Sequence, residues 1–190
     1  MTHGDAIICT VGRSESDVGQ LSILNMMHRE SSFLQEDLER WDTGLGASIG
    51  AKVACPEKTV INMAGDGCFR MNFNELLTAS KYNIPIIEVI FNNNVLGMVR
   101  QWQTLFYEKR YSSTILNGDF DYAKIAEACG CRGINVTNKE ELIAAMKEAL
   151  SADGPVVINC VIDSDDKVWP MVAPGASISE AFSEEDMIRK

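Results

Sequence analysis

The chain has 190 residues, with 17 basic and 27 acidic side chains, a net charge of -10 and 46% apolar residues. This size and apolar content suit one domain with a sizeable core. The acidic balance argues against nucleic acid and anionic membranes as partners, because both need Lys and Arg to neutralise phosphate. No apolar run approaches the roughly 18 residues of a membrane span, and the first residues lack a signal peptide's basic region. We therefore expect a cytoplasmic protein.

The first third of the sequence predicts two strands separated by helical segments. Residues 5–10 (DAIICT) are predicted as a short strand, and residues 14–40 as mostly helical. A Gly-rich turn is expected to lead into a small-residue helix within 44–54. The run 58–65 (KTVINMAG) is β-rich with little polar alternation, which is typical of a strand buried on both faces.

Asn72 followed by Glu75 has the spacing of a capping box, with Asn in place of the usual Ser or Thr. We therefore expect a helix to begin at this point and to run over residues 73–82. This interpretation makes Glu75 a helix cap rather than a catalytic base.

The rest of the sequence alternates strands and helices up to residue 163. Strands are predicted at 84–92, 131–136 and 154–163. Helices are predicted at 98–107, at 120–130 with a Gly stop, and at 139–150 with Asn138 as the cap. Residues 164–190 carry two prolines and a polar end, so we expect a C-terminal arm.

This alternation predicts an α/β fold: a doubly wound, mostly parallel sheet with helices on both faces, in a single domain over residues 1–190. Ligands of such sheets bind beyond the carboxyl ends of the strands. The polar segments at Gly65 and at Asn92 both follow predicted strands, so we expect them at the same edge of the sheet.

Gly65-Asp66-Gly67 and Asn92-Asn93 carry the candidate chemistry. A single crossover helix separates them, so the Asp66 carboxylate and the Asn93 amide oxygen are expected side by side, with a backbone carbonyl near Val95. Such hard oxygen ligands suit Mg²⁺ or Ca²⁺, and Mg²⁺ commonly adds phosphate oxygens. The alternative is structural, because Gly-Asp-Gly alone is more often a tight turn. The Asn-Asn pair at this separation favours a metal that holds a phosphate.

The run GDGCFRMNFNELLTASKYNIPIIEVIFNNNVLGMVRQWQTLFY resembles the cofactor-binding domain of the acetolactate synthase large-subunit family, which uses thiamine diphosphate. IGAKVACPEKTVI and WPMVAPGAS extend the resemblance over residues 45 to about 180. The resemblance implies the thiamine-diphosphate-binding fold, and decarboxylation of pyruvate followed by ligation to a second 2-oxoacid.

The resemblance also implies individual roles. Asp66, Asn93 and the Val95 carbonyl would bind Mg²⁺. Contacts to thiamine diphosphate would come from Gln20, Gly65, Gly67, Cys68 and Met98. Trp102, one turn after Met98, would line the substrate entrance, although this spacing is also ordinary for core residues.

Family members have three domains, and the glutamate that activates the cofactor lies on the first domain of a neighbouring chain. The sequence departs from the family in a short Gly-rich segment and in VGRSESDVGQLSILN. Two hypotheses follow. The chain is the cofactor half of a 2-oxoacid enzyme, inactive without a homo-oligomer or a partner carrying the pyrimidine-binding domain, or it is a non-catalytic module that keeps the fold.

Six cysteines are scattered along the chain, and Cys129-Gly-Cys131 is the one close pair. With no secretion signal and no matching second pair, we expect reduced thiols rather than disulfides or zinc. His3 and His28, the two histidines, lie in no motif and receive no role.

Overall fold

The computed structural model describes residues 6–11, 31–35, 42–116, 118 and 120–188. Within them a six-stranded sheet has the order β2-β1-β3-β4-β6-β5, and every pair of neighbouring strands is parallel. The strands are β1 (Ala6–Val11), β2 (Ser31–Gln35), β3 (Thr59–Gly65), β4 (Ile86–Asn92), β5 (Arg132–Val136) and β6 (Val156–Val161). The predicted parallel sheet is confirmed.

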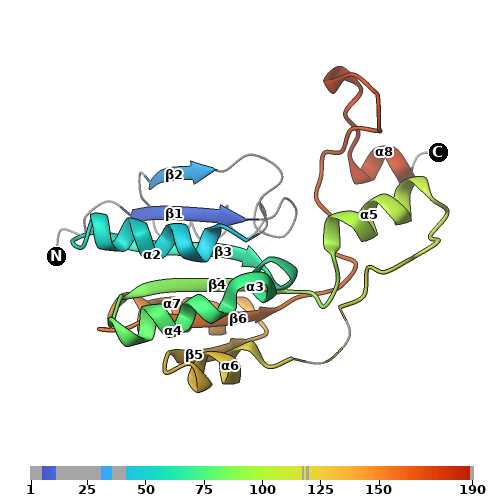
Figure 1. The fold of residues 1–190 in the computed structure, drawn as a ribbon. Coiled ribbons are helices and arrows are strands. Elements are labelled where there is room, and N and C mark those ends of the chain that lie inside the picture. The colour runs from blue at the N-terminus through green and yellow to red at the C-terminus, as the bar shows by residue number, and fades with distance from the viewer. Residues whose placement is uncertain (1–5, 12–30, 36–41, 117, 119, 189–190) are drawn as a thin grey trace.

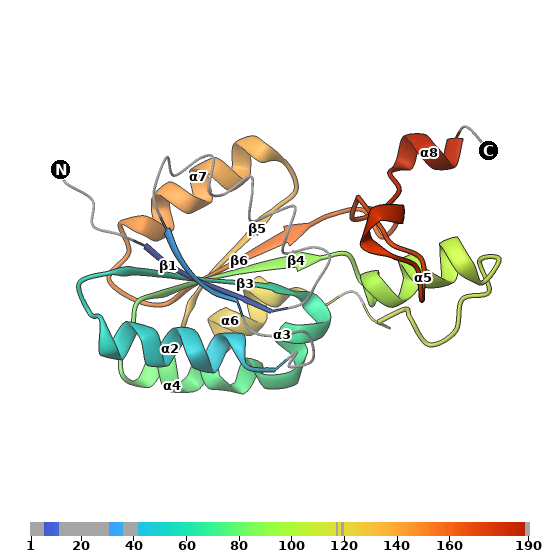
Figure 2. The same cartoon turned by 90° about the horizontal axis from the view of Figure 1, so that it is seen from above.

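Helices cover both faces of the sheet (Figures 1 and 2). The first face carries α2 (Gly44–Ala54), α3 (Asp66–Asn72), the 3₁₀ turn η1 (Phe73–Glu75), α4 (Leu76–Lys81) and α6 (Tyr122–Ala128). The second face carries α7 (Lys139–Leu150). Each face buries its own apolar cluster, one built around Phe69 and Tyr122 and the other around Met63 and Met146.

Beyond the carboxyl ends of the strands lies α5 (Gly97–Phe106), beside the C-terminal segment that carries η2 (Ile178–Glu180) and α8 (Glu184–Ile188) (Figures 1 and 2). Aromatic rings join these parts. Phe182 packs edge-on against Phe106 of α5, with ring centroids 6.3 Å apart, and against Trp169 at 5.9 Å. No helix in the described ranges is long and apolar enough to cross a bilayer.

Three local predictions are wrong. The segment 14–40 contains the strand β2, although 12–30 and 36–41 lie outside the described residues. The helix α2 begins at Gly44 itself, so the expected Gly-rich turn is its first turn.

The third error is the capping box at Asn72. The chain enters a helix directly at Asp66, seven residues earlier than Phe73, and the Asn72 side chain caps nothing. Its amide nitrogen donates to the Asp42 carbonyl instead. A tertiary contact with the segment before α2 therefore replaces the local contact that the spacing predicts.

Two predicted helix ends are confirmed. After α6, Gly130 has a φ of +82°, and the Cys131 N–H donates to the Ala126 carbonyl at 2.9 Å. At the start of α7, Asn138 Oδ1 accepts from the Glu141 N–H at 2.9 Å.

Asn138→Ala is expected to lower the free energy of unfolding by about 1 kcal/mol, because the first turn of α7 loses the acceptor for an otherwise unpaired N–H. Urea unfolding followed by circular dichroism measures this change. Asn138→Asp, which keeps an oxygen acceptor, is the control, and an equal loss in both variants would contradict the capping role.

Cys129 and Cys131 are free thiols, as expected. Burial raises the pKa of Cys131 to about 11, which keeps this thiol protonated. No group of three or more His, Cys, Asp or Glu side chains gathers to hold a metal in the described part of the chain.

Candidate functional site

The candidate site lies where the neighbouring strands β3 and β4 end. Gly65, the last residue of β3, is in register with Phe91 of β4. After Gly65 the chain turns directly into α3, whereas β4 is followed by the loop 93–96 that leads to α5. The two predicted polar segments therefore meet at one edge of the sheet, as expected.

Asp66 connects the two segments. Its side chain is 1% exposed. Oδ1 accepts a hydrogen bond from the Gly67 N–H in the first turn of α3, at 2.9 Å. Oδ2 accepts one from the Asn94 N–H in the loop between β4 and α5, also at 2.9 Å. A carboxylate has about four acceptor positions, so these bonds hold the group in place while leaving capacity for a cation.

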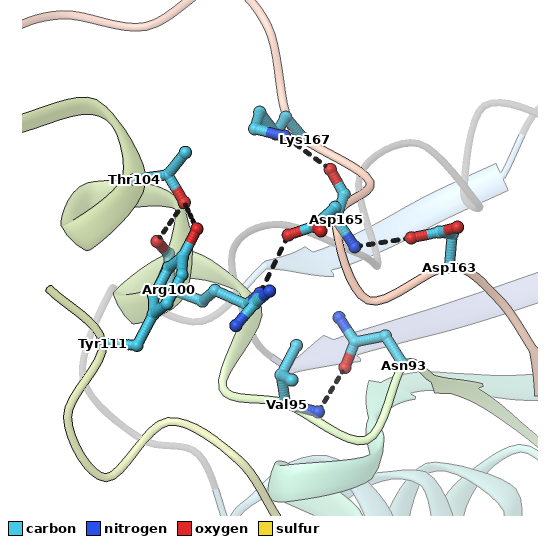
Figure 3. A network of polar contacts seen from close by, with 8 residues as sticks. All are labelled: Asn93, Val95, Arg100, Thr104, Tyr111, Asp163, Asp165 and Lys167. Carbon is cyan, nitrogen blue, oxygen red and sulfur yellow. Dashed lines mark hydrogen bonds and ion pairs between the residues drawn. The ribbon is translucent and has the colours of Figure 1, made fainter. Parts of the chain in front are cut away.

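The loop after β4 folds around Asn93. Asn93 Oδ1 accepts from the Val95 N–H at 3.1 Å, which closes a turn of the Asx type (Figure 3). Asn94 has a φ of +59°, a left-handed conformation that Asn tolerates better than most residues. This conformation accompanies the Asn94 N–H bond to Asp66. Asn93 is 2% exposed and Val95 is 5% exposed, so both residues of this turn are buried.

A second segment of chain braces this loop. The Leu96 N–H donates to the Thr114 carbonyl at 2.8 Å, and the Leu116 N–H donates to the Asn94 carbonyl at 2.9 Å, so that Val95 and Ile115 form an antiparallel bridge. The flanking residues use their backbone groups in this bridge, which leaves the Val95 carbonyl directed to the other side. The sequence gives no signal for this contact, because residues 108–119 read as a plain loop.

Gly67 sits close to the same loop. A Cβ built there would lie 3.0 Å from Leu96 Cδ2 and 3.6 Å from Leu116 Cδ1. The absence of a side chain therefore lets the backbone N–H groups at the start of α3 approach the loop closely.

Two buried polar atoms close to the loop have no hydrogen-bond partner: Asn92 Oδ1 and Thr114 Oγ1. Asn92 is 3% exposed and Thr114 is 1% exposed. Unpaired buried acceptors and hydroxyls are costly, and a bound ion or an ordered water is one way in which such atoms are satisfied. Like the Asp66 carboxylate and the Asn93 amide oxygen, both are hard oxygen atoms, the type of ligand that Mg²⁺ prefers.

The loop continues into α5, which carries Met98 and Trp102. Both side chains are half-buried, and the Trp102 ring packs edge-on against Phe106 with centroids 5.7 Å apart. The two residues lie one turn apart on α5, as predicted. Gln20, the remaining predicted contact, lies outside the described residues.

Polar side chains of α5 fix its position. Arg100 Nε bonds Asp165 Oδ1 at 2.9 Å, and the guanidinium stacks 4.1 Å from the Tyr111 ring centroid (Figure 3). The hydrogen bond from Arg100 holds the pKa of the Asp165 carboxyl below its usual range. Gln101 is 2% exposed and forms two hydrogen bonds with the backbone of Val168. Gln101 Nε2 donates to the Val168 carbonyl at 2.8 Å, and the Val168 N–H donates to Gln101 Oε1 at 2.9 Å. These contacts tie α5 to the C-terminal segment.

A family described as "Thiamine pyrophosphate enzyme, C-terminal TPP binding domain" matches residues 17–160. The chain belongs to this family. The resemblance predicted from the sequence motifs is thereby confirmed, and so is the thiamine-diphosphate-binding fold.

Several relatives are acetolactate synthases. The chain is 41% identical to the acetolactate synthase isozyme 2 large subunit of Escherichia coli K12 over 170 residues, which are 87% of this chain and 31% of that protein. It is 48% identical to the mitochondrial acetolactate synthase catalytic subunit of Saccharomyces cerevisiae over 138 residues, which are 72% of this chain and 20% of that protein. The chain thus spans a third or less of the length of these relatives.

A solved structure of the same kind is the thiamine diphosphate-dependent 4-hydroxybenzoylformate decarboxylase of Rhodococcus jostii RHA1. It superimposes with a TM-score of 0.59 at 32% sequence identity, over 63% of this chain and 23% of that chain. The fold is therefore shared with an enzyme that uses thiamine diphosphate.

Proposed function

We propose that the chain is the cofactor-binding part of an acetolactate synthase-like enzyme, in which Asp66, Asn93 and the Val95 carbonyl bind Mg²⁺ and the Mg²⁺ binds the diphosphate of thiamine diphosphate. The observation that carries this proposal is the 2.9 Å bond from the Asn94 N–H to Asp66 Oδ2, because it joins the two segments that would supply the ligands. The relatives named acetolactate synthase support the activity of the whole enzyme.

The predicted site residues have distinct parts in this proposal. Gly67 and Cys68 lie in the first turn of α3, where their backbone would contact the diphosphate, although the Gly67 N–H also donates to Asp66 Oδ1. Gln20 and Gly65 are assigned to the same end of the cofactor. Met98 would support the cofactor rings, and Trp102 would line the entrance for a 2-oxoacid of the pyruvate class. The bound cofactor supplies the electron sink for decarboxylation. This chain positions it and excludes water around the buried ligands.

The direct test is a calorimetric titration with thiamine diphosphate, with Mg²⁺ present and again with the metal chelated. We expect a one-site binding heat that disappears on chelation, because the diphosphate would meet few cations on a chain of net charge -10 without the metal. Equal binding in both conditions would refute the metal site. No binding in either condition would favour the non-catalytic module.

The isolated chain is expected to form no acetolactate from pyruvate, because the resemblance puts the glutamate that activates the cofactor on another domain. An assay for acetolactate, with thiamine diphosphate and Mg²⁺ in excess, checks this expectation. Turnover by the pure chain would contradict it and would require a proton-transferring group within these residues.

A second candidate is the cofactor part of a 2-oxoacid decarboxylase that performs no ligation, which the superposition on 4-hydroxybenzoylformate decarboxylase favours. Product analysis of the complete enzyme separates the two candidates, since a decarboxylase releases an aldehyde and a synthase releases a longer hydroxy acid. The homo-oligomer, the partner with the pyrimidine-binding domain and the cytoplasmic location belong to the same proposal.

A further inference from the structure

Glu88 lies in the middle of β4, with strands on both sides and helices over both faces, and its side chain is 0% exposed. It is in register with Asn62 of β3 on one side and with Val157 of β6 on the other. Burying an ionised carboxylate without a cation costs several kcal/mol. Glu88 has no ion-pair partner among the described residues.

Among the described residues, the Glu88 carboxyl forms a hydrogen bond with Asn62, which is 1% exposed. Asn62 Nδ2 donates to Glu88 Oε2 at 2.7 Å. The other oxygen of each group, Asn62 Oδ1 and Glu88 Oε1, is buried without a hydrogen-bond partner. Both of these oxygens are acceptors when Glu88 is ionised. A proton on Glu88 Oε1 would turn that oxygen into a donor.

Charged groups on the neighbouring elements engage other partners. Lys52 of α2 donates to the carbonyls of Pro56 and Lys58, and Lys81 of α4 lies over the Tyr82 ring. Their ammonium groups are thus held away from Glu88.

Three further titratable groups lie on the same side of the sheet. Cys9 of β1 is in register with Asn62, Tyr122 begins α6, and Asp66 is held at the strand end by backbone N–H groups. None of them is a cation. Arg70 of α3 is a cation on this side of the sheet, but its guanidinium lies over the Phe120 ring, 4.8 Å from the centroid. It interacts with Tyr122 rather than with Glu88. Burial therefore dominates and raises the pKa of Glu88 to about 8, and the Asn62 hydrogen bond opposes this shift.

We infer that Glu88 is a neutral carboxylic acid that forms a reciprocal pair with Asn62, in which Glu88 Oε1 carries a proton and donates it to Asn62 Oδ1. One proton then satisfies both leftover oxygens. The opposite orientation of the Asn62 amide leads to the same conclusion, because Oδ1 would then face Oε2 and two oxygens at that distance need a proton between them.

The pair joins the two strands that deliver the candidate ligands. Asn62 precedes Asp66 by four residues on β3, and Glu88 precedes Asn93 by five residues on β4. Loss of the proton would leave a buried carboxylate between these strands. The pair therefore makes the stability of the sheet next to the site depend on pH. This inference does not require that the chain binds a metal.

The sign of the pH dependence follows from the raised pKa. Below the unfolded-state value of 4.5, Glu88 is protonated in both states and its contribution to stability is complete. Between 4.5 and about 8 the unfolded chain releases the proton while the folded chain keeps it. The folding equilibrium constant therefore falls by about tenfold per pH unit in this range and levels off above it.

Glu88→Gln tests the inference, because a Gln amide forms the same two bonds with Asn62 without a titrating proton. Urea unfolding between pH 5 and pH 9 measures the folding equilibrium constants of both chains. The ratio of the constant of Glu88→Gln to that of the original chain should rise with pH, by on the order of a thousandfold in total. The exposed Glu57→Gln makes the same charge change at the surface and should show no such trend. A Glu88→Gln advantage that does not change with pH would overturn the inference.

If Glu88→Gln does not fold, infrared spectroscopy of the unsubstituted chain can show the protonation state of Glu88 directly. At pH 6.5 we expect the carbonyl stretch of a neutral carboxylic acid, shielded from rapid exchange and lost as pH rises through about 8. Absence of this band at pH 6.5 would show that Glu88 is ionised and would overturn the inference.

Discussion

Gly133→Ala is expected to lower the free energy of unfolding by about 3 kcal/mol or more. A Cβ at Gly133 would lie 2.1 Å from the Ala123 carbonyl oxygen and 2.6 Å from its carbon. These are backbone atoms of α6, which packs directly on β5, so no side-chain rotation relieves the clash. The helix must move as a unit, and Tyr122 and Ala126 of the buried cluster must move with it.

Urea unfolding measures this loss, and Gly50→Ala is the matched control. Gly50 lies in α2, where an added Cβ meets no atom within 4 Å. Ala is favoured over Gly in a helix by up to about 1 kcal/mol, so Gly50→Ala should be neutral or stabilising. Equal effects of the two substitutions would mean that α6 does not lie against β5 as closely as described.

Asp66→Ala is expected to weaken Mg²⁺-dependent binding of thiamine diphosphate at least about 100-fold, because removing even an indirect partner of a metal ligand typically costs 10–100-fold. The variant also loses the acceptor for the Gly67 and Asn94 N–H groups. Charge-assisted bonds of this kind contribute about 1.5–3 kcal/mol each when one partner is removed. The loop after β4 should therefore loosen as well.

Asp66→Asn separates the two effects. It keeps one oxygen for the Asn94 N–H and removes the charge, so the fold should survive better than in Asp66→Ala while metal-dependent binding is still lost. Asp166→Asn, an exposed change in the C-terminal segment with the same loss of charge, should leave binding unchanged. Full binding by Asp66→Asn would show that the carboxylate is structural.

The sequence predicted the central strands of the sheet but missed β2, because a strand buried on both faces has a recognisable apolar pattern. KTVINMAG and IPIIEVIFN are mostly apolar runs without polar alternation, and a strand covered on both faces needs such a run. The meeting of Asp66 with the Asn93 loop also followed, since parallel neighbours place their carboxyl ends together. Asn138 and Gly130 were predictable because helix ends depend on local residues.

Contacts between distant segments escaped prediction. The capping box at Asn72 failed because its amide binds Asp42, thirty residues earlier. The bridge between Val95 and Ile115, which supports the candidate ligands, pairs two short stretches with no strand-like pattern. The pairing of Glu88 with Asn62 also joins two strands, and only the register of β4 against β3 brings these two side chains together.

The most direct test of the central claim is to locate the metal itself. Mn²⁺ can replace Mg²⁺ and broadens nuclear magnetic resonance signals of nearby amides. With thiamine diphosphate present, we expect the Gly67, Cys68 and Asn94 amide signals to broaden first, and Asp66→Ala to abolish the effect. Broadening confined to the acidic C-terminal residues 163–166 and 184–186, with the Gly67 and Asn94 signals unchanged, would contradict a metal site formed by Asp66 and Asn93.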